Sequence, residues 1–196
     1  MQATTLSFST IHLHGELFAD MLRARHRTFV QRMGWELPVA DGLEYDQYDT
    51  PACRWVVVHQ DGLVRAGVRL LPTTTRCGIY SYMARDAQMG LLPGMPENLL
   101  FEEAPVDPEI WEASRIFVSE DVPARERARA QQQLITEMVQ VVRQMGGARL
   151  LGIVPELGPR LARRTGLDCR PAGPVLDFGD GGQHLCVNIC MVSARA

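Results

Sequence analysis

The sequence predicts one α/β domain, residues 1–196, in which helices flank both faces of a mixed β-sheet. Three patterns lead to this prediction: a β-hairpin signal in 54–71, a long amphipathic helix over 124–145, and a strand pattern on each side of that helix. The hairpin contributes antiparallel strands, whereas strand, helix and strand in succession form a parallel, right-handed βαβ unit. A chain of 196 residues can bury a substantial core in a single domain.

The N-terminal part predicts one strand, one helix and the hairpin. Weak alternation over 6–13 indicates a first strand, and the apolar spacing over 16–32 indicates an amphipathic helix that Gly34 ends. Residues 38–48 are predicted to be a loop. In 54–71, RWVVVHQDGLVRAGVRLL, two runs of β-branched residues flank an Asp-Gly pair, which is a strong hairpin turn.

The remainder of the chain predicts alternating strands and helices. Residues 72–108 are rich in Pro, Gly and Met and are expected to hold a short helix among loops. The later elements are a strand at 109–118, the long helix stopped by two glycines, a buried strand at 148–154, a helix from Pro155 to about residue 165, and strands near 176 and at 185–192. This order is the outline of an N-acyltransferase fold of the acetyltransferase (GNAT) type, an α/β/α sandwich with a splayed sheet.

The composition excludes several classes of protein. A net charge of −3 argues against general binding of nucleic acid, which needs a clustered basic surface. No apolar run approaches the roughly 20 residues that cross a bilayer, and the N-terminus lacks the pattern of a secretion signal. We therefore expect a cytoplasmic protein without a membrane span. The chain contains no Lys, which excludes chemistry through a lysine Schiff base.

Metal-binding patterns are weak. The five cysteines include no C-x-x-C pair, and Cys186 and Cys190 fall in one predicted strand, which favours packed thiols over a structural metal. The stretch DGLEYDQYD at 41–49 has the composition of a Ca²⁺ loop, but its spacing does not fit the EF-hand pattern. We expect no bound metal.

Several charged residues occur where charge is costly, inside apolar helix and strand patterns or just before a buried strand. Taken singly, each fits a solvated face or a wet loop. Taken together, three arginines and three acids can balance one another in a cleft, because paired and hydrogen-bonded charges are tolerated there. The six are Arg25, Asp46, Asp49, Arg69, Glu112 and Arg115.

Such a cluster suits a zwitterionic ligand. A ligand carboxylate prefers the forked guanidinium of an arginine, whereas an ammonium or sulfonium prefers carboxylates and an aromatic face. Trp35, just before the acidic loop, is a candidate for that face.

Four motifs within this set resemble those of the acyl-homoserine lactone synthases, the LuxI-type autoinducer synthases. RHRTFVQRMGWE at 25–36 resembles their R-x-x-x-F-x-x-x-x-G-W opening, and GLEYDQYD at 42–49 their G-x-E-x-D-x-(F/Y)-D element. VRLLPTT at 68–74 and WEASRIFV at 111–118 resemble their R-L-x-P-T and W-E-x-S-R-(F/Y)-F-V elements. Order and spacing agree over about 25–165, whereas the last thirty residues match only loosely.

The resemblance implies a reaction and a set of site residues. The family joins an acyl chain from acyl carrier protein, or from acyl-CoA in some members, to the amine of S-adenosylmethionine. The product lactonises and releases methylthioadenosine (MTA), and no cofactor is expected. By position, the residues implied for the S-adenosylmethionine cleft are Arg25, Phe29, Trp35, Asp46, Asp49, Arg69 and Arg115, and Arg25, Arg115 and Glu112 are the implied catalytic residues.

The resemblance also implies an acyl pocket with Met83, Phe117 and Gly152. Met83 stands where the family usually has Phe, and a flexible thioether can fill the same apolar wall. Family members that prefer 3-oxo chains often have a hydroxyl residue at the position of Gly152. Glycine offers no such donor, so we expect an unsubstituted or branched acyl group.

The chemistry requires a base, because an amine attacks a thioester only when it is neutral. Glu112 is the candidate, acting through a water molecule. In a regular strand Glu112 and Arg115 point to opposite faces, so we expect a bulge near Ala113 or Ser114.

The acyl donor is predicted from the start of the long helix. SEDVPARERARAQQQ contains no Gly-rich loop for a pyrophosphate, whereas Arg125, Arg127 and Arg129 suit an acidic carrier protein and its phosphopantetheine phosphate. A solvated helix start is an equally good interpretation, and acyl-CoA stays open as donor. Two rival functions also stay open: an N-acyltransferase of another amine, and a non-catalytic homologue that binds S-adenosylmethionine or a carrier protein.

Overall fold

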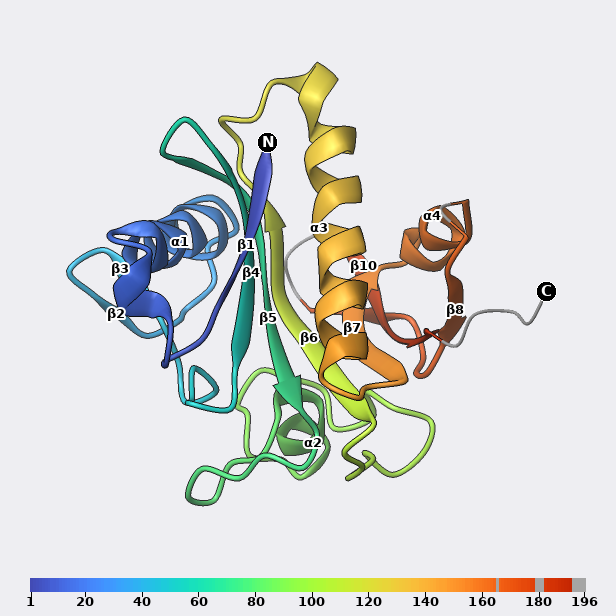
Figure 1. Cartoon of the computed structure of the whole chain (residues 1–196). Coiled ribbons are helices and arrows are strands. Elements are labelled where there is room, and N and C mark those ends of the chain that lie inside the picture. Colours follow the sequence, from blue (N-terminus) through green and yellow to red (C-terminus); the bar gives the residue numbers. More distant parts are fainter. Residues whose placement is uncertain (165, 179–181, 192–196) are drawn as a thin grey trace. The chain divides into compact units, whose positions relative to one another are not determined.

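A computed structural model describes residues 1–164, 166–178 and 182–191 (Figure 1). The chain forms two compact units, each built from two separate segments: the first unit comprises Met1–Leu70 and Arg115–Val141, and the second Leu71–Ser114 and Val142–Ala196. Two strands and the long helix therefore run from one unit into the other along the chain. Whether the whole chain acts as one domain stays a prediction.

The first unit contains an antiparallel arrangement of β1 (Gln2–Leu6), β4 (Arg54–Gln60) and β5 (Leu63–Pro72). The predicted hairpin is confirmed: Gln60 pairs with Leu63, and Asp61 and Gly62 have φ angles of 53° and 77°, which match a type I′ turn. The prediction of a first strand over 6–13 was wrong. The strand ends at Leu6 because the Ser7 N–H donates to the Thr10 hydroxyl at 3.0 Å and starts a turn.

The helices of the first unit begin with α1 (Leu17–Arg25), which continues without a break into a π-helix, η2 (His26–Arg32). The wider winding is visible at its end, where the Met33 N–H donates to the Thr28 carbonyl at 3.2 Å. Gly34, with φ of +70°, follows as predicted. The predicted loop at 38–48 contains a small hairpin, β2 (Val39–Ala40) and β3 (Leu43–Glu44).

The long helix α3 (Ala124–Gln144) agrees with its predicted bounds, and Gly146 follows it with φ of +83° (Figure 1). Its buried side chains recur at helical spacing on one side. They include Ala130, Leu134, Met138, Val141 and Val142.

The second unit is built on a mixed set of strands. The first half of β6 (Ile110–Val118) runs parallel to β7 (Arg149–Pro155), as the predicted βαβ unit requires, and β7 pairs antiparallel with β10 (Gln183–Cys190). β10 also pairs with β8 (Asp168–Pro171) and β9 (Leu176–Asp177). The helices are α2 (Met83–Gln88) and α4 (Gly158–Arg164).

Two elements of the second unit differ from the sequence prediction. Helix α4 begins at Gly158 rather than at Pro155, because β7 extends to Pro155 and pairs it with His184. Strand β8 was not predicted, since four residues are too few to show a period. The predicted ends at 165 and 192 lie outside the described residues. Among the described helices, none is long and apolar enough to span a bilayer.

Candidate active site

Six charged side chains of the first unit form a closed ring of ion pairs, which we call the charge ring. Three arginines alternate with three acids, so that each guanidinium bridges two carboxylates and each carboxylate bridges two guanidinium groups. The members in ring order are Arg25, Glu44, Arg115, Asp46, Arg69 and Asp49. The ring is electrically neutral, which is how a buried charge becomes affordable.

Arg25, at the end of α1, is only 1% exposed and holds two acids. Its Nε donates to Glu44 Oε2 at 2.5 Å, while Nη1 and Nη2 donate to the two oxygens of Asp49 at 2.8 and 3.0 Å. This fork is the strongest geometry that a guanidinium and a carboxylate adopt. The alternative that Arg25 reaches the solvated surface is therefore wrong.

The other two arginines complete the charge ring. Arg115 donates from Nε to Glu44 Oε1 at 3.1 Å and from Nη2 to Asp46 Oδ2 at 2.8 Å. Arg69, on β5, donates from Nη1 to Asp46 and lies 3.1 Å from Asp49 Oδ2. Both arginines are buried side chains on strands, so the alternative of a solvated strand face is also wrong.

Every carboxylate oxygen of the charge ring accepts at least one hydrogen bond. Besides the arginines, the Tyr48 N–H donates to Asp46 at 2.9 Å, the Asp46 N–H donates to Asp49 at 2.9 Å, and the indole of Trp55 donates to Asp49 at 3.0 Å. The acidic loop of 42–49 is thus fastened to the helix and strands by its own side chains.

The electrostatics favour ionised aspartates. Burial by itself raises the pKa of both Asp46 and Asp49, but neighbouring arginines outweigh burial and hold each pKa below its usual value. Arg69 acts on both acids, joined by Arg115 at Asp46 and by Arg25 at Asp49. Conversely, the acids hold the pKa of Arg69 above its usual value although burial lowers it.

An aromatic group lies beside the charge ring. The rings of Phe29 and Trp35 stack with centroids 5.2 Å apart, and Phe117 meets Phe29 edge-on at 6.1 Å. The guanidinium of Arg115 lies over Phe29, 5.6 Å from the centroid. Gly67 leaves space for Phe117, because a Cβ at position 67 would fall 2.7 Å from its ring.

The backbone of β6 is irregular at Arg115, which has φ of +52° and is one of the non-glycine residues in the left-handed region. The sequence predicted an irregularity at Ala113 or Ser114, and the structure puts the turn of the backbone one residue later. The change of direction breaks the strict alternation of the strand, so the facing of Arg115 is set separately from that of Glu112.

Glu112 lies in the second unit and is 1% exposed. Its two oxygens accept the N–H groups of Met83 at 3.1 Å and Ala84 at 2.8 Å, at the first turn of α2. Met83, a predicted acyl-pocket residue, is therefore bonded through its backbone to the predicted base. Gly152, on β7, has no free space for a side chain, because a Cβ there would lie 3.0 Å from the Ala113 carbonyl.

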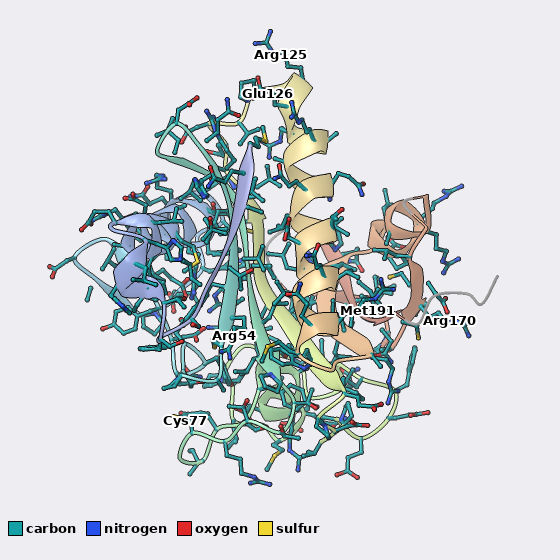
Figure 2. All side chains as sticks on the ribbon, viewed as in Figure 1. Arg54, Cys77, Arg125, Glu126, Arg170 and Met191 are labelled. Atoms are coloured by element: carbon teal, nitrogen blue, oxygen red, sulfur yellow. The ribbon has the colours of Figure 1, made fainter. Side chains whose placement is uncertain are left out.

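The three arginines at the start of α3 differ in their surroundings. Arg125 is 86% exposed and lies 3.6 Å from Glu126, and Figure 2 shows both side chains projecting from the beginning of the helix. Arg127 donates to the Ser119 carbonyl at 3.2 Å, so it fixes the loop before the helix. Arg129 is exposed.

Sequence reasoning missed two members of the site. Glu44 takes the place in the charge ring that Glu112 was expected to fill, and Trp55 supplies an indole donor. A signal for Glu44 was present, because it is the glutamate of the G-x-E-x-D motif and belongs to the same short loop as Asp46 and Asp49. Within the described residues, no cluster of three or more His, Cys, Asp or Glu side chains is arranged to hold a metal ion.

Comparison with known proteins decides the family. Residues 9–170, which carry all six members of the charge ring, match the autoinducer synthase family. The chain belongs to the autoinducer synthase family. Across 167 residues it is 37% identical to an acyl-homoserine-lactone synthase of Ralstonia solanacearum, a match that covers 82% of this chain and 76% of that protein.

Two solved structures of such synthases share the family fold. TofI, crystallised in a ternary complex with an inhibitor and MTA, superposes with a TM-score of 0.77 at 26% identity, over 97% of this chain and 92% of TofI. BjaI, a CoA-dependent acyl-homoserine lactone synthase solved with MTA, gives a TM-score of 0.77 at 25% identity, over 96% of this chain and 82% of BjaI. The predicted mixed sheet flanked by helices is thereby confirmed, as is the resemblance on which the GNAT-like fold rests.

Proposed function

We propose that this chain synthesises an acyl-homoserine lactone from S-adenosylmethionine and an acyl thioester, releasing MTA. The observation that carries the proposal is the family match over 9–170, with a charge ring made from three of the four motifs and the base candidate on the fourth-motif strand. The named activity of a relative 37% identical over most of the chain supports the same reaction. As in the sequence prediction, the cytoplasm is the proposed location.

The first chemical step forms an amide. The α-ammonium of S-adenosylmethionine loses a proton to Glu112 through a water molecule, and the neutral nitrogen attacks the thioester carbon. The C–N bond forms, the C–S bond breaks, and the thiolate leaves with the proton that the nitrogen sheds. Backbone N–H groups hold the Glu112 carboxylate in place for this task.

The second step closes the lactone. An oxygen of the methionine carboxylate attacks the γ-carbon of the same molecule, and the electrons of the C–S bond leave with neutral MTA. The reaction is intramolecular and forms a five-membered ring, so holding the chain in a folded conformation does most of the work. The stack of Phe29 and Trp35 beside the charge ring gives a flat apolar wall for that purpose.

The charge ring acts mainly as a frame in this proposal. Its arginines and acids already satisfy one another, so it presents the substrate with a fixed, dry arrangement of charge rather than with mobile side chains. Preorganised dipoles cost no reorganisation when charge moves in the transition state. Substrate selectivity for a sulfonium amino acid follows from the negative and aromatic groups at the edge of this frame.

The proposed acyl donor is an acyl carrier protein, which approaches Arg125 and Arg129 at the start of α3. Both guanidinium groups are exposed and suit an acidic partner, whereas Arg127 is occupied by the Ser119 carbonyl. Acyl-CoA is the rival donor, favoured by the CoA dependence of BjaI. For the acyl group, the crowded Gly152 with no donor favours an unsubstituted or branched chain over a 3-oxo chain.

The test combines purified protein, S-adenosylmethionine and a panel of acyl thioesters on carrier protein and on CoA. Mass spectrometry of the products should detect an acyl-homoserine lactone and MTA in equal amounts. Acylation of a different amine without MTA would instead establish the rival N-acyltransferase. Binding of S-adenosylmethionine without any turnover would establish the non-catalytic homologue.

A further inference from the structure

We propose that Asp86 is a positioning residue for Glu112, an inference that rests on the proposed function. Asp86 lies in α2 and is 0% exposed. Both of its carboxylate oxygens accept the N–H of Ser81, at 3.1 and 3.0 Å. A carboxylate buried in a six-residue helix is costly unless it is bonded, so its position calls for a purpose.

The position of Ser81 explains that purpose. Ser81 lies two residues before Met83, whose N–H, with that of Ala84, donates to Glu112. Asp86 therefore fixes the entry of the chain into α2, and the entry fixes the direction of the two N–H groups that orient the base. A helix this short is not stable by itself, so its first turn depends on such contacts.

The opposite side of α2 is also fastened. The Tyr82 hydroxyl donates to the Pro105 carbonyl at 2.6 Å, and Arg85 donates to the Ala104 carbonyl at 3.0 Å. Gln88 exchanges two bonds of 2.8 Å with the backbone of Glu102 and Ala104. These bonds hold the body of the helix, which leaves Asp86 to set the shape of its first turn.

The charged and titratable groups around this turn come from several elements. Tyr82 and Arg85 lie with Asp86 on or next to α2, and Cys186 lies on β10. Burial first and Glu112 second raise the pKa of Tyr82, and the same two causes raise the pKa of the Cys186 thiol to about 12. Both groups are thus neutral near pH 7, and Glu112 is the group that can accept a proton there.

The test compares Asp86→Ala with Asp86→Asn. Both variants remove the negative charge, but only Asn keeps an oxygen that accepts the Ser81 N–H. We expect Asp86→Ala to lower kcat about 10-fold, a part of what a general base contributes, with an unchanged KM for S-adenosylmethionine. Asp86→Asn should recover most of that loss. The acidic limb of the kcat/KM profile should lie at higher pH in the Ala variant than in the Asn variant, because N–H donors stabilise the ionised base.

Equal kcat values and equal pH limbs in the two variants would overturn the inference, even if both lower thermal stability. Should Asp86→Ala not fold, Asp86→Glu carries the test, because it retains the charge and displaces the carboxylate by one methylene. A lower kcat at unchanged KM supports positioning, and a wild-type kcat overturns it. The proposed function fails separately, if the unaltered protein makes no lactone from any donor.

Discussion

Arg25 and Arg115 donate their Nε–H groups to the two oxygens of one carboxylate, that of Glu44, at 2.5 and 3.1 Å. One arginine comes from a helix near the N-terminus and the other from a strand late in the first unit. The shared acid therefore ties two distant segments together at a buried point, and the predictions below begin there.

Glu44→Gln should destabilise the protein strongly. The substitution keeps the shape but leaves the buried ring with an excess positive charge, and removing one partner of a buried pair costs about 3–5 kcal/mol. Urea unfolding followed by fluorescence would measure the loss. Glu16→Gln is the matched control, because Glu16 is exposed and lies 3.5 Å from Arg23, where an ion pair is worth about 0–1 kcal/mol. Equal effects of the two variants would contradict the buried-ring account.

Stability should fall as the pH drops below about 4, near the pKa of aspartate in an unfolded chain. Burial raises the pKa of Asp46 and Asp49, the arginines lower it further, and the net folded pKa lies below the unfolded value. The unfolded chain therefore binds more protons in this range, and the stabilisation present above it is lost as pH falls. Urea midpoints measured at successive pH values give the slope. Asp46→Asn should make that slope shallower, and an unchanged slope would count against these two acids as its source.

Gly67→Ala should cost about 1–3 kcal/mol through overpacking, because the new Cβ would fall 2.7 Å from the ring of Phe117. Adding Phe117→Leu should restore part of this loss, since the smaller side chain frees the space. Thermal unfolding of both single variants and the double variant would measure the coupling. Strict additivity of the two changes would show that the glycine does not serve Phe117.

Glu112→Gln should reduce kcat by about 10²–10⁴ and leave the KM for S-adenosylmethionine nearly unchanged, because a general base acts in the transition state. Gln keeps one oxygen for the N–H groups of Met83 and Ala84, so folding should survive. Steady-state kinetics with lactone detection provides the measurement. A variant with full kcat would exclude Glu112 as the base.

Replacing Arg125 and Arg129 by Gln should raise the KM for acyl carrier protein several-fold and leave the rate with acyl-CoA unchanged. Both side chains are exposed, so the protein itself should not be destabilised. The wild-type KM for the carrier should rise with salt, and the variant should lose that dependence. Equal rates with both donors before and after substitution would remove the start of α3 as the docking site.

The sequence was most informative where the chemistry is local. The Asp-Gly turn of the hairpin, the glycine after the π-helix and the glycine after α3 each reflect a backbone conformation that few residues adopt, so they were predicted correctly. A four-residue strand such as β8 has no such mark. The π-helix was predicted only as a helix, because apolar spacing does not distinguish the two windings over seven residues.

The candidate site was predictable in membership but not in pairing. Arg25, Asp46, Asp49, Arg69 and Arg115 were all identified, because charge in an apolar pattern and the family motifs both mark them. Which acid completes the set depends on how the acidic loop folds back on α1. Only coordinates reveal that Glu44 fills this place and that Glu112 bonds to the start of α2.

The π-helix has a consequence for any attempt to shorten the chain. An α-helix advances each residue by about 100°, and a π-turn accommodates one additional residue within the same rise. Removing a single residue between Arg25 and Phe29 would let the segment wind as an ordinary helix, which would rotate everything that follows by that angle. Arg25 would keep its acids, while Phe29 would turn away from Trp35 and from the guanidinium above it. The spare residue thus sets the phase between the electrostatic and the aromatic half of the first unit.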